Sequence, residues 1–123
     1  MYDYFYQYNC KEVCSVEDMS LTEMQEMQRI LQEKYFQKWG GLSPEKAAHK
    51  LLWLYGELGE VGDIIKKQGN HNIMNDPETR RHFVEEMCDV MMYFHDVMLC
   101  YSVTPEEMAS VYRDKFHKNL TRW

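Results

Sequence analysis

Residues 51–65 read Leu-Leu-Trp-Leu-Tyr-Gly-Glu-Leu-Gly-Glu-Val-Gly-Asp-Ile-Ile. Residues 83–94 read Phe-Val-Glu-Glu-Met-Cys-Asp-Val-Met-Met-Tyr-Phe. In both segments apolar side chains recur every three or four residues, which predicts an amphipathic helix. These are the two most apolar helical stretches of the chain, so we expect them to form the centre of an all-helical fold.

Each of these helices carries a pair of acids three residues apart, Glu57 with Glu60 and Glu86 with Asp89. Residues i and i+3 lie on the same side of a helix, so each pair points in one direction. Carboxylates are seldom placed beside a core-facing edge unless something offsets the loss of their hydration. If the two helices pack antiparallel, the pairs meet, and a shared divalent cation would offset that loss.

Helix start and stop signals predict four helices. Their expected ranges are Ser20 to Lys38, Ser43 to Lys67, Asp76 to Cys100 and Thr104 to Asn119. Ser20 and Glu23 form a capping box, Gly40-Gly41 ends the first helix, and Gly69 ends the second, with a polar loop over 69–75. No segment alternates with a period of two. We therefore predict an all-α fold, a four-helix bundle over residues 20–123, preceded by an N-terminal arm at residues 1–19.

Composition limits the partners that the chain can have. The 123 residues carry a net charge of −6 and no basic block, which argues against a nucleic-acid polymer. No apolar run approaches the ~20 residues that span a membrane, and Met1-Tyr-Asp-Tyr-Phe-Tyr lacks the basic start of a signal peptide. The cysteines show neither a disulfide framework nor zinc-like spacing. We expect a cytoplasmic protein with no membrane partner.

Each central helix has two stripes. On the second helix a core stripe is expected at Leu51, Leu54, Tyr55, Leu58, Val61 and Ile65, and on the third at Phe83, Met87, Val90, Met91, Phe94 and Met98. The acids lie on a neighbouring stripe, with Trp53 one turn before Glu57 and Tyr93 one turn after Asp89. The first helix is expected to use Met24, Met27, Leu31 and Tyr35 as its core stripe. The third helix is also apolar on its opposite side, at Met92, which predicts subunit contacts in a homodimer or homotetramer.

Three motifs in order resemble the MazG-like superfamily of all-α nucleoside triphosphate pyrophosphohydrolases. The first is Glu57-Leu-Gly-Glu60 within residues 55–63, and the second is Glu86-Met-Cys-Asp89 within residues 85–90. The third is the C-terminal segment Lys115-Phe-His-Lys-Asn119-Leu-Thr-Arg122. The resemblance covers about residues 20–123 and implies a four-helix MazG-like bundle that is oligomeric.

The resemblance implies an enzyme that cleaves a nucleoside triphosphate to a monophosphate and pyrophosphate. Mg²⁺, with Mn²⁺ as a substitute, would be held by Glu57, Glu60, Glu86 and Asp89, because Mg²⁺ prefers oxygen ligands. By the same resemblance Glu57 is expected to act as general base, and Lys115 and Asn119 to contact phosphate oxygens. Trp53, Tyr93 and Trp39 are candidates to stack on the base, although aromatic residues at helical spacing are more often core.

Three other functions fit parts of the pattern. A di-iron carboxylate bundle also uses helical acids, but it needs Glu-x-x-His ligands, and positions 60 and 89 hold Glu and Asp. A noncatalytic nucleotide-binding or assembly module would be expected to have lost an acid, and the quartet is complete. A phosphoribosyl-ATP pyrophosphohydrolase performs a similar cleavage, and the sequence does not separate it from the proposed enzyme.

Overall fold

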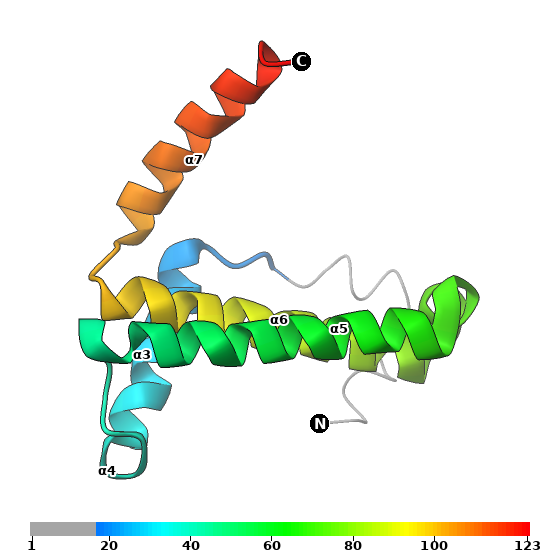
Figure 1. The fold of residues 1–123 in the computed structure, drawn as a ribbon, viewed down its shortest axis with the longest axis horizontal. Coiled ribbons are helices and arrows are strands. Elements are labelled where there is room, and N and C mark those ends of the chain that lie inside the picture. Colours follow the sequence, from blue (N-terminus) through cyan, green and yellow to red (C-terminus); the bar gives the residue numbers. More distant parts are fainter. Residues whose placement is uncertain (1–16) are drawn as a thin grey trace.

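The computed structural model describes residues 17–123, and over that range it contains helices and turns but no strand (Figure 1). The elements are α3 (Leu21–Lys34), α4 (Phe36–Trp39), the 3₁₀ turn η1 (Pro44–Lys46), α5 (Ala47–Asn75), α6 (Pro77–Cys100) and α7 (Pro105–Leu120). The all-α prediction is thereby confirmed. Residues 1–16, most of the predicted arm, lie outside the described range. Within residues 17–123 no helix has the length and apolarity to cross a bilayer.

Three of the four predicted helix starts are confirmed by side-chain caps. At the fourth, Ser43 makes no capping bond, and α5 begins only at Ala47, after the turn η1. Ser20 Oγ accepts a hydrogen bond from the Glu23 backbone N–H at 3.1 Å, and the Glu23 carboxylate accepts one from the Ser20 N–H at 3.0 Å. The side chain of Asp76 caps α6, and that of Thr104 caps α7, by the same kind of bond. Each cap satisfies a backbone donor that the first helical turn leaves without a partner.

Two other predicted boundaries are wrong. The first helix does not run unbroken to Lys38, because Tyr35 leaves helical geometry (φ −105°, ψ 22°) and separates α3 from α4. The predicted polar loop over 69–75 is helical, since α5 breaks at Gly69 (φ 78°, ψ 165°) and then resumes as far as Asn75. Asn72 and Asn75 stabilise this turn by donating to backbone carbonyls four residues earlier, each at 2.9 Å.

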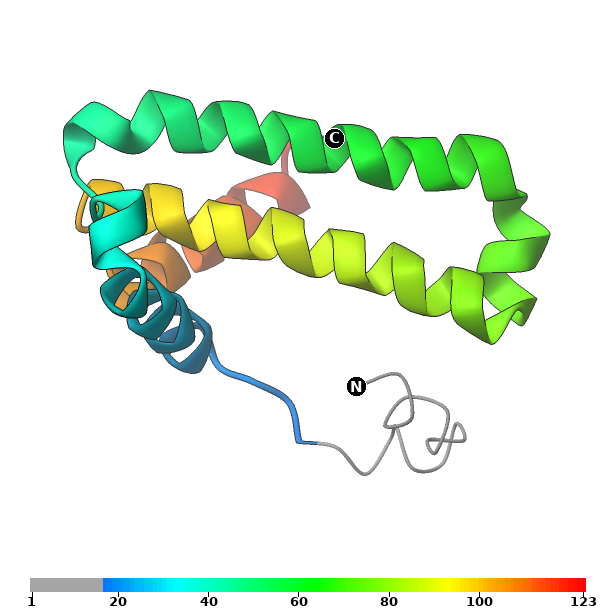
Figure 2. The same cartoon turned by 90° about the horizontal axis from the view of Figure 1, so that it is seen from below.

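Helices α5 and α6 form a long antiparallel hairpin, which is the body of the molecule (Figure 2). The face of α5 that is turned inward carries Leu54, Val61 and Ile64. The predicted core stripes are therefore rotated. Four members of the α5 stripe are at least 38% exposed, namely Leu51, Tyr55, Leu58 and Ile65. On α6 the exposed members are Met87, Met91 and Phe94. The rotation directs the edge bearing Glu57 toward α6.

Helix α3 packs across α6 mainly through glutamines, while the predicted stripe is only half-buried at Met24 and Leu31 and is exposed at Met27 and Tyr35. Gln25, Gln28 and Gln32 are buried, whereas Met27 and Ile30 are 56% and 55% exposed. Glutamine can occupy this face because α6 and the following turn offer acceptors, among them the Val103 carbonyl at 3.0 Å from Gln25 Nε2.

Helix α7 extends away from the hairpin, as Figure 1 shows. Its main helix contacts are with α3, and every residue from 110 to 123 is exposed. The exposed side chains include the apolar Val111, Tyr112, Phe116 and Leu120. A 16-residue helix with so little packing is marginal on its own in water, so α7 presents an apolar face that lacks a covering layer within residues 17–123.

Candidate functional site

Three of the four predicted acids meet where α5 faces α6. One carboxylate oxygen from each of Glu57, Glu86 and Asp89 lies within 4.8 Å of the others, and all three side chains are partly buried. Glu57 comes from the inward edge of α5, while Glu86 and Asp89 lie one turn apart on α6. We call these three residues the acid cluster. Oxygen atoms this close, from two rigid helices, can share one or more hard divalent cations.

The electrostatics of the acid cluster fit a cation site. Partial burial raises the pKa of Glu57, and a hydrogen bond with Glu86 and the negative charges of Asp89, Glu86 and Glu60 raise it further. Partial burial also raises the pKa of Asp89, with repulsion from Glu86 and Glu85 in the same direction. The protein thus holds together carboxylates that repel one another, and a bound cation would remove this repulsion.

Glu60, the fourth predicted ligand, is exposed and lies outside the acid cluster. It is close enough for its charge to raise the pKa of Glu57. His82 Nε2 lies 3.3 Å from Glu86 Oε1, one turn before it on α6, and its side chain is 60% exposed. Within residues 17–123 the acid cluster contains no histidine, so the ligand set of a di-iron bundle is not reproduced there.

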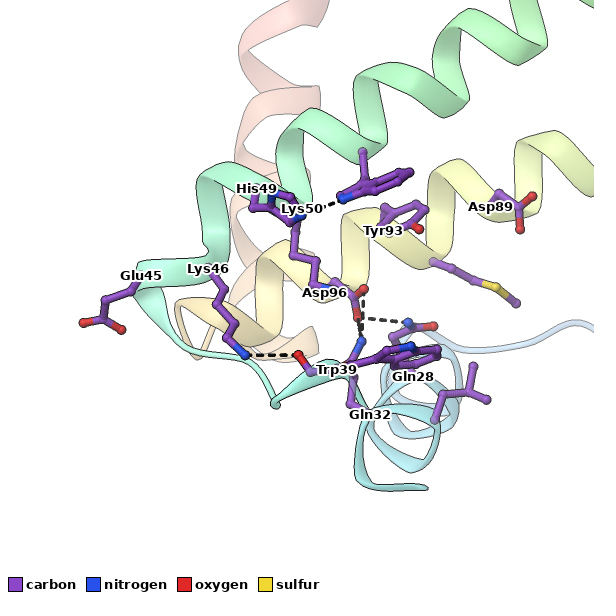
Figure 3. A pocket seen from close by; sticks show the side chains of 13 residues that line it. Gln28, Gln32, Trp39, Glu45, Lys46, His49, Lys50, Asp89, Tyr93 and Asp96 are labelled. Atoms are coloured by element: carbon purple, nitrogen blue, oxygen red, sulfur yellow. Dashed lines mark hydrogen bonds between the residues drawn. The ribbon is translucent and has the colours of Figure 1, made fainter. Parts of the chain in front are cut away.

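A cavity of about 560 Å³ opens beside the acid cluster, and Asp89 belongs to both (Figure 3). Its walls come from α3, α4, the start of α5 and the second half of α6. The three predicted aromatic candidates, Trp39, Trp53 and Tyr93, all line it. Lys46, His49 and Lys50 add basic or polar groups at the end formed by η1 and the start of α5.

The aromatic side chains of this cavity are held in place by specific contacts. Trp53 and Tyr93 stack with ring centroids 6.4 Å apart and planes 12° from parallel, which links α5 to α6. Trp53 Nε1 donates to His49 Nε2 at 2.8 Å. The Trp39 carbonyl accepts from Lys46 Nζ at 3.1 Å. Burial raises the pKa of Tyr93, and the negative charges of Glu57, Asp96 and Asp89 add to this, so its hydroxyl stays a hydrogen-bond donor.

A buried polar group forms one wall of the cavity. Asp96 is only 2% exposed and accepts from Gln28 Nε2 at 2.9 Å and from Gln32 Nε2 at 3.2 Å. Burial raises the pKa of Asp96, while the bond from Gln28, the Lys50 charge and the bond from Gln32 oppose that rise. Gln32 Oε1 is buried and has no hydrogen-bond partner among the described residues. We call Asp96, Gln28 and Gln32 the polar wall.

Lys115 and Asn119, the predicted phosphate contacts, are not brought to the acid cluster within one chain. Both are exposed on α7, which extends away from the α5–α6 hairpin (Figure 1). Neither residue lines the cavity.

The sequence pattern did not predict the polar wall. Gln25, Gln28 and Gln32 recur at i, i+3 and i+7, the spacing of an inward helix face, but polar side chains in that pattern resemble a solvated surface. Asp96 follows Phe94 and His95 in an otherwise apolar stretch, which was the available signal. An acid in such a place needs nearby donors, and the glutamines of α3 supply them.

Comparison with known proteins adds no further information: no family model, curated protein or solved structure matches the chain.

Proposed function

We propose that this protein is a Mg²⁺-dependent nucleoside triphosphate pyrophosphohydrolase, with a MazG-like arrangement of its helices in an oligomer. The observation that carries the proposal is the acid cluster opening onto an aromatic cavity. The two ends of a nucleoside triphosphate have the chemistry that these two parts of the site can bind. Its polyphosphate requires cations beside carboxylates, and its base requires flat apolar surfaces.

In this proposal the residues of the acid cluster and of the cavity have different roles. Glu57, Glu86 and Asp89 would hold Mg²⁺ or Mn²⁺, with Glu60 completing the set from the exposed side. The ion, when bound, supplies a Lewis acid that offsets the phosphate charge and makes a water molecule more acidic. By the resemblance, Glu57 would take the proton from the attacking water. Trp53, Tyr93 and Trp39, which all line the cavity, would offer flat apolar surfaces to the base.

A panel of canonical and damaged ribo- and deoxyribonucleoside triphosphates, assayed with Mg²⁺, tests this proposal. We expect monophosphate and pyrophosphate in equal amounts from at least one substrate. Product analysis must separate pyrophosphate from phosphate, since sequential loss of phosphate would indicate another phosphohydrolase. Phosphoribosyl-ATP belongs in the panel, because its exclusive use would favour the histidine-pathway enzyme. Nucleotide binding without any turnover would favour the noncatalytic module.

The proposal includes a second copy of the chain. Exposed apolar side chains lie on α3, α5, α6 and α7, and a basic segment on α7 carries Arg113, Lys115 and Lys118. Packing α7 of one copy against the hairpin of another would complete a four-helix layer. It would also bring the positive charge of Lys115 and the neutral amide of Asn119 toward the acidic hairpin.

Phe116→Glu is expected to shift the protein toward monomer, because an unpaired charge is costly at an apolar interface. Light scattering at micromolar concentration measures the mass. Ser110→Glu, which adds the same charge to α7 at an exposed polar position, is the matched control. Phe116 is a better probe than Met92, because Met92 lines the cavity and its substitution would disturb both features. A fully active 14.9 kDa wild-type monomer would refute the oligomer.

A further inference from the structure

We propose that His49 is a positioning residue of the cavity, which holds the ring of Trp53 against that of Tyr93 so that the base of the substrate meets an ordered aromatic surface. This inference rests on the proposed function, because it takes the cavity as the site of the base. It assigns to His49 an effect on substrate binding and none on the chemical step.

The contact between His49 and Trp53 fixes the form of the histidine. Trp53 Nε1 donates a hydrogen bond to His49 Nε2 at 2.8 Å. An indole N–H can only donate, so the Nε2 atom carries no proton, and the proton of the neutral imidazole lies on Nδ1. The two residues are four positions apart on α5 and therefore lie on the same side of the helix. His49 thus serves Trp53 as an acceptor, and this property can be tested separately from its size.

Trp53 depends on such contacts because its surroundings do not enclose it. The residue is 51% exposed, so packing alone does not fix the ring. His49 meets the ring edge-on, with centroids 6.0 Å apart and planes at 77°. Tyr93 lies nearly parallel to it, with centroids 6.4 Å apart and planes at 12°. One contact comes from α5 and the other from α6, so together they restrict the orientation of the ring.

The pair of Trp53 and Tyr93 connects His49 to the acid cluster. All three residues line the cavity, and Figure 3 shows Tyr93 between His49 and Asp89. Tyr93 is close enough to the acid cluster for the charges of Glu57 and Asp89 to raise its pKa. A base stacked on the pair therefore has its phosphates on the side of the acids. A ring that is ordered in advance costs less entropy on binding than one that the ligand must order, so the loss of His49 should be seen in KM.

Two substitutions of His49 with similar volume separate the acceptor from the bulk of the side chain. Gln has an amide oxygen that can accept from Trp53 Nε1, whereas Met has no strong acceptor. In His49→Met we expect the KM of the best triphosphate to rise by about 3- to 10-fold, the effect of one ordinary hydrogen bond. We expect His49→Gln to stay within about 2-fold of wild type in KM, and kcat to stay within about 2-fold in both variants. His71→Met, on a part of α5 that does not line the cavity, should leave KM unchanged. Equal KM values for the Met and Gln variants would refute the positioning role, and so would a loss confined to kcat.

A second measurement does not depend on hydrolysis. The common deoxynucleosides carry a flat base and no phosphate. Their binding to the metal-free protein can be followed by quenching of tryptophan fluorescence, since Trp39 and Trp53 line the cavity. We expect His49→Met to weaken the tightest of these complexes by the same factor as it raises KM. In a Trp53→Leu background, where the ring to be held is absent, His49→Met should have no further effect.

The outcomes distinguish this inference from the proposed function. Weaker deoxynucleoside binding in His49→Met, without hydrolysis of any triphosphate by the wild type, would retain the positioning role and refute the pyrophosphohydrolase. Hydrolysis with the same KM in wild type and His49→Met would retain the enzyme and refute the positioning role. An equal effect of His49→Met with and without Trp53 would also refute the positioning role.

Discussion

Glu86→Gln is expected to reduce turnover of the best triphosphate by at least about 100-fold, because it removes a cation ligand without changing side-chain volume. Glu57→Gln and Asp89→Asn should do the same, since the three carboxylates meet within 4.8 Å. Steady-state kinetics at saturating Mg²⁺, with circular dichroism to confirm the helices, provides the measurement.

Two control variants sharpen this experiment. Glu26→Gln alters an exposed acid on α3 that pairs with Arg29 at 3.3 Å, and it should have little effect on turnover. Glu60→Gln distinguishes a three-ligand site from a four-ligand site. The motif predicts a loss equal to that of Glu86→Gln, whereas the exposure of Glu60 leads us to expect a loss of ~10-fold or less. Equal losses at Glu26 and Glu86 would contradict the site itself.

Although Glu57→Gln should reduce turnover, it should increase the stability of the metal-free protein. A carboxyl group whose pKa is raised by folding holds its proton more tightly in the folded state than in the unfolded state. The free energy of unfolding therefore falls as the pH rises above the ordinary pKa of a glutamate side chain toward the raised pKa of Glu57. Glu57→Gln removes this loss and should raise the thermal midpoint of metal-free protein at neutral pH.

Excess EDTA is expected to abolish turnover, and added Mg²⁺ or Mn²⁺ to restore it. The reason is that a polyphosphate and the acid cluster repel each other unless cations lie between them. The apparent metal affinity should weaken as the pH falls, because protons compete for carboxylates whose pKa values are raised. Isothermal titration with Mn²⁺ at several pH values measures how the metal affinity depends on pH. Full turnover in excess EDTA would refute the proposal that the acid cluster works with a divalent cation.

The fold class, three of the four helix starts and the acids of the acid cluster were predictable because they depend on local chemistry. Capping by Ser20, Asp76 and Thr104 involves residues within three positions, and the spacing of Glu86 and Asp89 is a property of one helix. The rotation of α5 was not predictable, because both of its faces are apolar and either could face α6. The Asp96 contacts join residues 64 to 68 positions apart, so no local pattern reports them.

The exposed Met27 and Ile30 of α3 and the uncovered length of α7 have a thermodynamic consequence. The described residues bury few large apolar side chains, so a single copy gains little from burial to offset the entropy of ordering its helices. If a second copy covers these faces, folding and association become one equilibrium. The melting temperature would then rise with protein concentration, and dilution would unfold as well as dissociate the protein. Active enzyme in a cell would increase more steeply than the amount of chain synthesised.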